Sequence, residues 1–121
     1  MKYVEIQEMS RDEAAAVLTN GTTDEKIIAL LSLALYDNDS KWVETICADY
    51  LNDNNPSLRG IAVQCFGHLA RIHRVIHDTV IIDKIYQLSN DDNQTVRGQA
   101  EGAISDFRIF LKLKCKRFKH K

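Results

Sequence analysis

The sequence predicts an all-α protein, a short right-handed solenoid built from pairs of helices. Residues 55–74 favour one long amphipathic helix, because apolar residues recur there at spacings of three and four over about four turns. The apolar positions are Leu58, Ile61, Ala62, Cys65, Phe66, Leu69 and Ile72. The start of this helix returns 38 residues later, where Asn55-Pro-Ser-Leu-Arg-Gly-Ile-Ala lies over Asn93-Gln-Thr-Val-Arg-Gly-Gln-Ala. A recurring helix is typical of a solenoid, whose units each need a neighbour to bury their apolar face.

The chain is expected to open with an arm and a capped helix, over residues 1–21. Ser10 is a suitable N-cap, and Glu13 follows three residues later, as in a capping box. Before Ser10 the pattern is weak, and its apolar residues are expected to dock as an extended arm or a short turn. These residues are Tyr3, Val4 and Ile6.

A second helix, over residues 23–36, is predicted to be a degenerate copy of the repeat. Laying Lys26 over Arg59, at an offset of 33 residues, places Ala29 over Ala62, Leu33 over Phe66 and Tyr36 over Leu69. Read by helical spacing alone, its apolar stripe is Ile27, Leu30, Leu31, Ala34 and Leu35.

The repeats are expected to fill residues 22–111, and a basic tail follows over residues 112–121. Caps and apolar spacings predict further helices over 41–51, 56–72, 79–89 and 94–111. The β-branched run in 80–85 also fits a strand, but its cap and the absence of a partner strand favour helix. The sequence order suggests the pairs 23–36 with 41–51 and 56–72 with 79–89. The last helix then lacks a partner or takes the tail as one.

Composition favours one soluble domain in the cytosol. The chain has 121 residues, of which 45% are hydrophobic and 27% charged. No apolar run approaches the length of a membrane span, and the acidic N-terminus does not resemble a signal peptide. The three cysteines are odd in number. Cys47 and Cys65 fall on apolar helical stripes, so they are interpreted as reduced core residues.

The near-zero net charge hides two poles of opposite sign. Residues 1–56 hold eleven acids against four bases, a net charge of −7, and residues 57–121 hold six acids against twelve bases, +6. Half of those bases lie in the tail. The tail has two interpretations: a contact with nucleic acid or an anionic membrane, or a solubilising extension of the last helix.

The repeated phrase Asn-x-x-(Leu/Val)-Arg-x-x-Ala resembles the HEAT repeat, an α-solenoid unit related to the armadillo repeat. Arg59 and Arg97 match the arginine of that pattern, and Asp53 and Asp91 or Asp92 stand in the preceding turns. The resemblance implies that such arginines and aspartates form a structural ladder between repeats. Gly60 and Gly98, at equivalent positions, are expected to allow close helix approach.

No constellation predicts catalysis, a metal or a cofactor. His73 and His77 have an i, i+4 spacing that suits zinc on one helical face, but the helix is expected to end between them and no third ligand is spaced to join them. A phosphate-binding loop, a cysteine pair and a nucleophile elbow are all missing from the sequence. The protein is therefore predicted not to be an enzyme and to have no small-molecule substrate.

Two aromatic residues beside acids are the candidate partner-binding residues. Trp42 lies about 100° from the centre of its helix's apolar stripe, at nearly the same azimuth as Asp49 and Asp53. Tyr86 lies off its own stripe in the same way, beside Asp83. Aromatic residues ringed by acids suit the capture of a basic protein, here by the second helix of each pair. The alternative is that Trp42 packs against the preceding helix pair.

The resemblance extends to small HEAT-type immunity proteins of bacterial toxin–immunity systems, including contact-dependent inhibition. It implies a protein that binds a cognate toxin domain, most simply a basic nuclease, and blocks its active site. Two other functions fit the same fold: a scaffold or adaptor domain, and a chromophore-lyase-like or nucleic-acid-binding HEAT protein. A contiguous acidic surface favours immunity, whereas a contiguous basic groove favours nucleic acid.

Overall fold

The computed structural model describes residues 5–111, and within this range the only regular elements are six α-helices. They are α1 (Arg11–Asn20), α2 (Thr23–Tyr36), α3 (Ser40–Ala48), α4 (Pro56–His73), α5 (Thr79–Leu88) and α6 (Gln94–Phe110). Residues 80–85 are helical, so the strand alternative for this run is wrong. The predicted all-α fold is confirmed.

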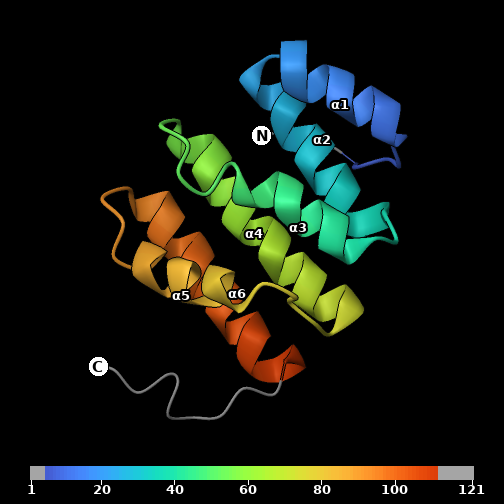
Figure 1. Cartoon of the computed structure of the whole chain (residues 1–121). Coiled ribbons are helices and arrows are strands. Elements are labelled where there is room, and N and C mark those ends of the chain that lie inside the picture. Colours follow the sequence, from blue (N-terminus) through green and yellow to red (C-terminus); the bar gives the residue numbers. More distant parts are fainter. Residues whose placement is uncertain (1–4, 112–121) are drawn as a thin grey trace.

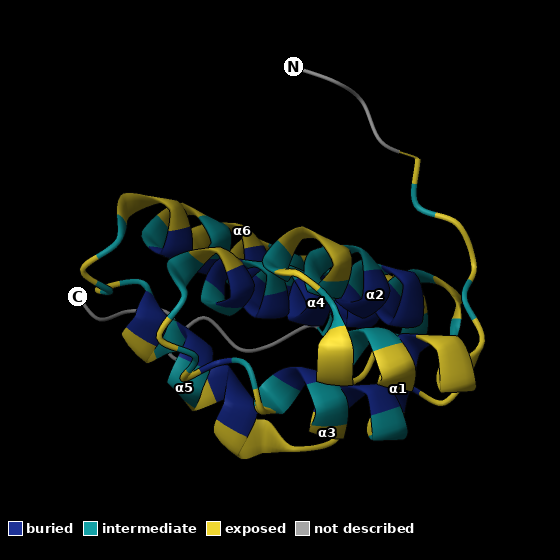
Figure 2. Ribbon diagram, turned by 90° about the horizontal axis from the view of Figure 1, so that it is seen from above, coloured by how far each residue is buried: buried dark blue, intermediate teal, exposed yellow. Residues whose placement is uncertain are grey.

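The helices form two layers. Helices α2, α4 and α6, which carry the repeated phrase, lie side by side in one layer, and α1, α3 and α5 form the second (Figures 1 and 2). Helix α4 is the centre of the molecule, because it packs on α2 at one side and on α6 at the other. This stacking of helix pairs is a short HEAT-like solenoid.

The helix pairs differ from those suggested by the sequence order. Helix α1 packs on α2, α3 mainly on α4, and α5 on α6 rather than on α4. The physical reason is the turn before each repeated phrase. Arg59 donates through Nη1 to the carbonyl of Asp53 at 2.8 Å, and Arg97 donates in the same way to that of Asp91 at 2.8 Å. Each arginine ties the turn to its own helix, which folds the preceding helix back onto it. The last helix therefore has its partner, α5.

Side-chain caps fix where the helices begin. Ser10 and Thr22 both form complete capping boxes, with Glu13 and Glu25 respectively. The other four helices are capped by Asp39, Asn55, Asp78 and Asn93. These caps confirm the predicted starts to within about a residue.

Helix α3 ends three residues earlier than the sequence suggested. The N–H groups of Asp49, Tyr50 and Leu51 each donate to the carbonyl three residues back, so the chain tightens after Ala48. Asp49 is therefore a C-cap residue, and Asp53 lies in the turn that follows. Neither continues the helical face of Trp42, so the azimuth argument that joined them does not hold.

The core lies between the layers and around α4. Helix α4 buries more than one stripe, because neighbouring helices cover it on both sides; Gly60, Val63, Gly67 and Ala70 are buried in addition to the predicted positions. Ile72 is the predicted position that the structure contradicts, since its side chain is 40% exposed near the end of the helix.

Two buried glycines of α4 face α6. A Cβ on Gly60 would lie 3.6–3.7 Å from Gln99 and Val96, and one on Gly67 would lie 3.6 Å from the Cα of Ala103. These are ordinary van der Waals distances, so alanine would also fit at Gly60, and the predicted need for a glycine there is not confirmed. For Gly98 it is wrong, because nothing described lies within 4 Å of its Cβ position. Helix α6 is the last described helix, so no described neighbour approaches it there.

The arm docks in an extended form on α2. Ser32, which is buried, donates its hydroxyl to the carbonyl of Gln7 at 2.9 Å, and Tyr36 donates to that of Ile6 at 3.0 Å. Tyr3 and Val4 lie outside the described residues, as does the basic tail from residue 112.

Candidate partner-binding surface

An arginine–aspartate pair joins two successive repeats, in the manner of the ladder that the HEAT resemblance implies. Arg59 donates through Nη2 and Nε to the two carboxylate oxygens of Asp91, at 2.8 and 3.1 Å, and so joins α4 to the turn before α6. Only 16% of the Arg59 side chain and 13% of the Asp91 side chain are exposed. This guanidinium, more than the N–H that Asn93 donates, holds the pKa of Asp91 below its ordinary value. The ladder implied by the HEAT resemblance is confirmed for Arg59.

Trp42 is part of the packing between α1 and α3. Its side chain is half-buried against the core, and the guanidinium of Arg11 lies 4.4 Å from the centroid of its ring. Arg11 in turn donates to both carboxylate oxygens of Asp37 at 2.8 Å, which lowers the pKa of that carboxyl. Arg11 thus covers one face of the indole, as the packing alternative for Trp42 supposed.

The structure brings together two of the predicted acids. Asp49 is exposed, Asp53 is half-buried and accepts the N–H of Asn55 at 2.8 Å, and both lie close enough to Tyr50 to contribute to its raised pKa. Burial is the larger cause of that shift. The other two predicted residues belong to α5, where Asp83 is exposed and Tyr86 packs half-buried against the core. Helices α3 and α5, which carry Trp42, Asp83 and Tyr86, lie in the same layer (Figure 2), and Asp49 and Asp53 follow the end of α3.

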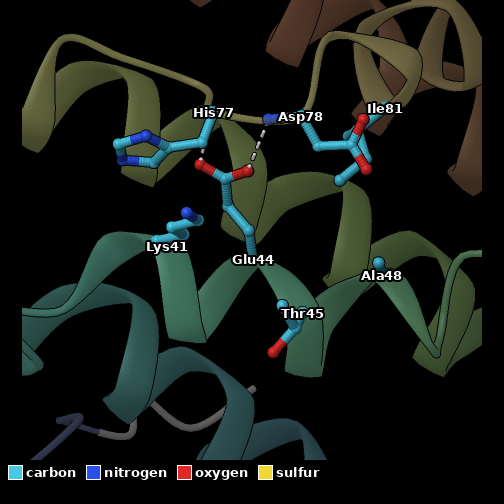
Figure 3. A pocket seen from close by; sticks show the side chains of 7 residues that line it. All are labelled: Lys41, Glu44, Thr45, Ala48, His77, Asp78 and Ile81. Carbon is cyan, nitrogen blue, oxygen red and sulfur yellow. Dashed lines mark hydrogen bonds between the residues drawn. The ribbon is translucent and has the colours of Figure 1, made fainter.

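A cavity of about 340 Å³ opens between α3 and the start of α5. It is lined by Lys41, Glu44, Thr45, Ala48, His77, Asp78 and Ile81 (Figure 3). The carboxylate of Glu44, a residue only 2% exposed, accepts the backbone N–H of His77 at 2.7 Å and that of Asp78 at 3.1 Å. Both oxygens are therefore engaged in fixing the start of α5 on α3.

Sequence reasoning missed this brace. It counted Glu44 only as one acid of the acidic half, because the groups that Glu44 binds are backbone N–H groups and leave no residue pattern. A charge is stable at a buried position when such donors surround it.

A second, more polar hollow of about 240 Å³ lies between α4 and α6. Its lining consists of Gln64, Gly67, His68, Gln99, Gly102, Ala103 and Asp106. Burial, and then the nearby Arg71, lower the pKa of His68, while Asp106 opposes the shift. The imidazole is therefore neutral at neutral pH. The hollow offers hydrogen-bonding groups on the layer opposite the five candidate residues.

Nothing among the described residues forms a metal centre. His73 is the last residue of α4, and His77 lies in the following loop with Nε2 3.2 Å from the Ser40 hydroxyl. Residues 5–111 contain no group of three His, Cys, Asp or Glu side chains that would hold a metal ion. Cys47 and Cys65 are buried free thiols, as predicted, and Cys115 lies outside the described range. None of the six helices is long and apolar enough to cross a membrane.

Comparison with known proteins agrees with this architecture. The family model of the HEAT repeat matches residues 45–73, which span the end of α3 and all of α4. The match thus also treats α3 and α4 as one unit, and with the ladder it defines a HEAT-repeat protein. A chain in the crystal structure of a CDI complex from Cupriavidus taiwanensis LMG 19424 is 34% identical, with a TM-score of 0.75. The alignment covers 91% of the present chain and 97% of that chain, so this protein belongs to the same family as that chain. No curated protein matches the sequence.

Proposed function

We propose that this protein is an immunity protein, which binds a toxin domain of a contact-dependent inhibition (CDI) system and neutralises it. The observation that supports this most directly is the 34% identity, over almost the whole of both chains, to a chain of a CDI complex. A solenoid of three helix pairs offers broad surfaces for another protein. Its buried ionisable groups serve the fold: Glu44 braces α5, and Arg59 joins two repeats.

The proposed mechanism is occlusion of the toxin's active site, in the cytoplasm and without chemistry by the immunity protein. Residues 1–56 carry a net charge of −7, and Asp49, Asp53 and Asp83 add carboxylates on the layer of α3 and α5. Such a surface attracts a basic cleft of the kind that binds phosphates, so the toxin we expect is a nuclease. Trp42 and Tyr86 supply half-buried aromatic area at the same surface.

The proposal predicts a toxin gene beside this protein's gene, and the first experiment uses the toxin domain that this neighbouring gene encodes. We expect co-expression of the immunity protein to restore growth of cells that express the toxin, and calorimetry to show a defined complex of the two purified proteins. Growth arrest despite co-expression, together with no detectable binding, would overturn the proposal. Binding of nucleic acid in place of the toxin would favour the nucleic-acid alternative.

Charge-reversal variants test the surface. Asp49→Lys and Asp83→Lys change exposed residues, so the fold should tolerate them, but association with the toxin should slow by roughly threefold to tenfold at low salt. Glu8→Lys, on the exposed arm, makes the same change in net charge elsewhere and serves as the control. Equal slowing by all three variants would place the attraction in the overall charge and not in this surface.

Trp42→Ala distinguishes a packing role of the indole from a role in toxin binding. Because Arg11 covers one face of the ring and the residue is half-buried, we expect the variant to melt at a lower temperature. A loss of toxin binding at an unchanged melting temperature would instead establish Trp42 as an interface anchor.

A further inference from the structure

The arginine ladder is open at its C-terminal end. Arg59 and Arg97 are equivalent, since each donates through Nη1 to the carbonyl six residues before it, in both cases at 2.8 Å. Arg59 also places Nε and Nη2 on the carboxylate of Asp91, in the next turn. Among residues 5–111, no carboxylate accepts from the corresponding donors of Arg97. Arg97 thus has no carboxylate partner within the described chain that corresponds to Asp91 at Arg59.

The face of α6 beside Arg97 corresponds to the face of α4 that packs on α6. Gly98 stands at the register of Gly60, yet no described atom lies within 4 Å of its Cβ position. A glycine inside a helix costs about 1 kcal/mol relative to alanine. At Gly98 no packing within the described chain offsets it.

Two further positions near this face are polar where α4 is apolar, and Ile109, on the same helical face as Gly98, adds an apolar side chain that is 59% exposed. The equivalents of the buried Val63 and Ala70 are Glu101 and Arg108, and both are exposed. A further HEAT unit with an apolar face is therefore a poor match. A face that combines exposed polar side chains with Ile109 and has room at a glycine is better suited to a separate, soluble protein.

We propose that this end face, defined as Arg97, Gly98, Glu101, Ser105 and Arg108, docks a segment of the toxin that presents an Asp or Glu side chain to Arg97. The partner carboxylate takes the place that Asp91 has at Arg59. The proposal rests on the proposed function for the identity of the partner. It adds a second contact region, at the C-terminal end of the solenoid, and the chemistry of the contacting group.

The toxin is favoured over the two other possible occupants of the end face because neither of them offers a carboxylate to Arg97. The chain's own tail, residues 112–121, has six bases and no acidic side chain to offer Arg97. If a second copy of the chain stacked head to tail on this end face, the turn before its α2 would lie next to Arg97. In that turn, the position equivalent to Asp53 and Asp91 is Asn20, which has no carboxylate.

Gly98→Gln and Arg97→Gln test the end face in the full-length protein. Gly98→Gln adds bulk where nothing described lies within 4 Å, so the free protein should melt at the same or a higher temperature. Affinity for the toxin domain encoded beside the gene should fall at least tenfold, because the added side chain holds the partner away. Arg97→Gln should also weaken binding at least tenfold, and binding should become less sensitive to salt. Ala16→Gln, on the exposed side of α1, is the matched control and should bind as the wild type does.

The outcomes distinguish this proposal from the one on which it rests. If the wild type binds the toxin and both end-face variants bind equally well, the end face is not an interface, but the immunity function stands. If the wild type does not bind, both proposals are overturned. If light scattering shows a wild-type dimer that Gly98→Gln dissociates, the occupant is a second copy and the assignment to the toxin is wrong.

Discussion

Removing the Arg59–Asp91 ion pair should destabilise the protein by an amount that depends on how far the pair is buried. Exposed ion pairs contribute about 0.2–1 kcal/mol, and breaking a fully buried pair costs about 3–5 kcal/mol. Arg59 and Asp91 are 16% and 13% exposed, so about 2 kcal/mol is reasonable for their two hydrogen bonds. Arg59→Met also removes the bond to the carbonyl of Asp53, worth about 1 kcal/mol. The expected total is about 3 kcal/mol, or a fall in melting temperature of roughly 10–20 °C.

A double-mutant cycle separates the pair from the rest. Asp91→Asn keeps an oxygen for the N–H of Asn93, so this variant should lose about 1.5 kcal/mol. We expect the double variant of Arg59→Met and Asp91→Asn to lose about 1.5 kcal/mol less than the sum of the losses in the two single variants. Urea unfolding at pH 7, extrapolated linearly to water, measures all four free energies of unfolding.

Arg97→Met is the internal control for this cycle. It removes the same side chain from an equivalent position, but there only the bonds to the carbonyls of Asp91 and Asp92 are lost. It should therefore cost about 1 kcal/mol and couple weakly to Asp91→Asn. A coupling below about 0.5 kcal/mol between Arg59 and Asp91, or equal costs for the two arginines, would refute the argument that the inter-repeat pair stabilises the solenoid.

Three further predictions concern pH, the core and the tail. Because Arg59 lowers the pKa of Asp91, the pair stabilises the folded state above the unfolded-state pKa of about 3.9, and this contribution is lost as pH falls through the folded-state pKa. The stability difference between wild type and Arg59→Met should therefore shrink below about pH 4 in urea titrations. A difference that stays constant with pH would contradict this origin. Phe66→Ala, at a fully buried position in the central helix, should cost about 3–5 kcal/mol in the same assay, and a loss below 1 kcal/mol would place the ring outside the core. A chain that ends at Leu113 should melt and bind the toxin as the full chain does, and a tenfold loss of affinity would assign the basic tail to the interface.

The fold was predictable because the repeat appears twice in the sequence. Alignment to the repeat added buried positions of α2 that helical spacing missed. It placed Ala29, Leu33 and Tyr36 over core residues; the first two are buried, but Tyr36 is 45% exposed. The spacing-based stripe contains the buried Leu30 and Ala34, whereas its other residues are only half-buried. A helix packed in a layer has neighbours on more than one side, so a single-stripe rule misplaces part of its core.

What sequence could not provide are the contacts that depend on the backbone and on neighbours. The pairing of α5 with α6 follows from the turn that Arg97 ties, and the buried position of Glu44 follows from two backbone N–H groups. The prediction of the candidate surface lost part of its support for the same reason, because sequence does not show where the backbone leaves the helix. An azimuth drawn along one helix assumed that Asp49 and Asp53 continue it, but the chain leaves the helix at Ala48.

The docking of the arm has a consequence for how this family can diverge. Ser32 and Tyr36 donate to carbonyl oxygens of residues 6 and 7, and every amino acid, including proline, supplies such an oxygen. Selection therefore acts on the two donors in α2, whereas the identities of the arm residues that they bind are free to drift. Among relatives we expect hydroxyl side chains to persist at positions 32 and 36 beside an arm of variable sequence. In that case an alignment would show a poorly aligned N-terminus although its docking is retained.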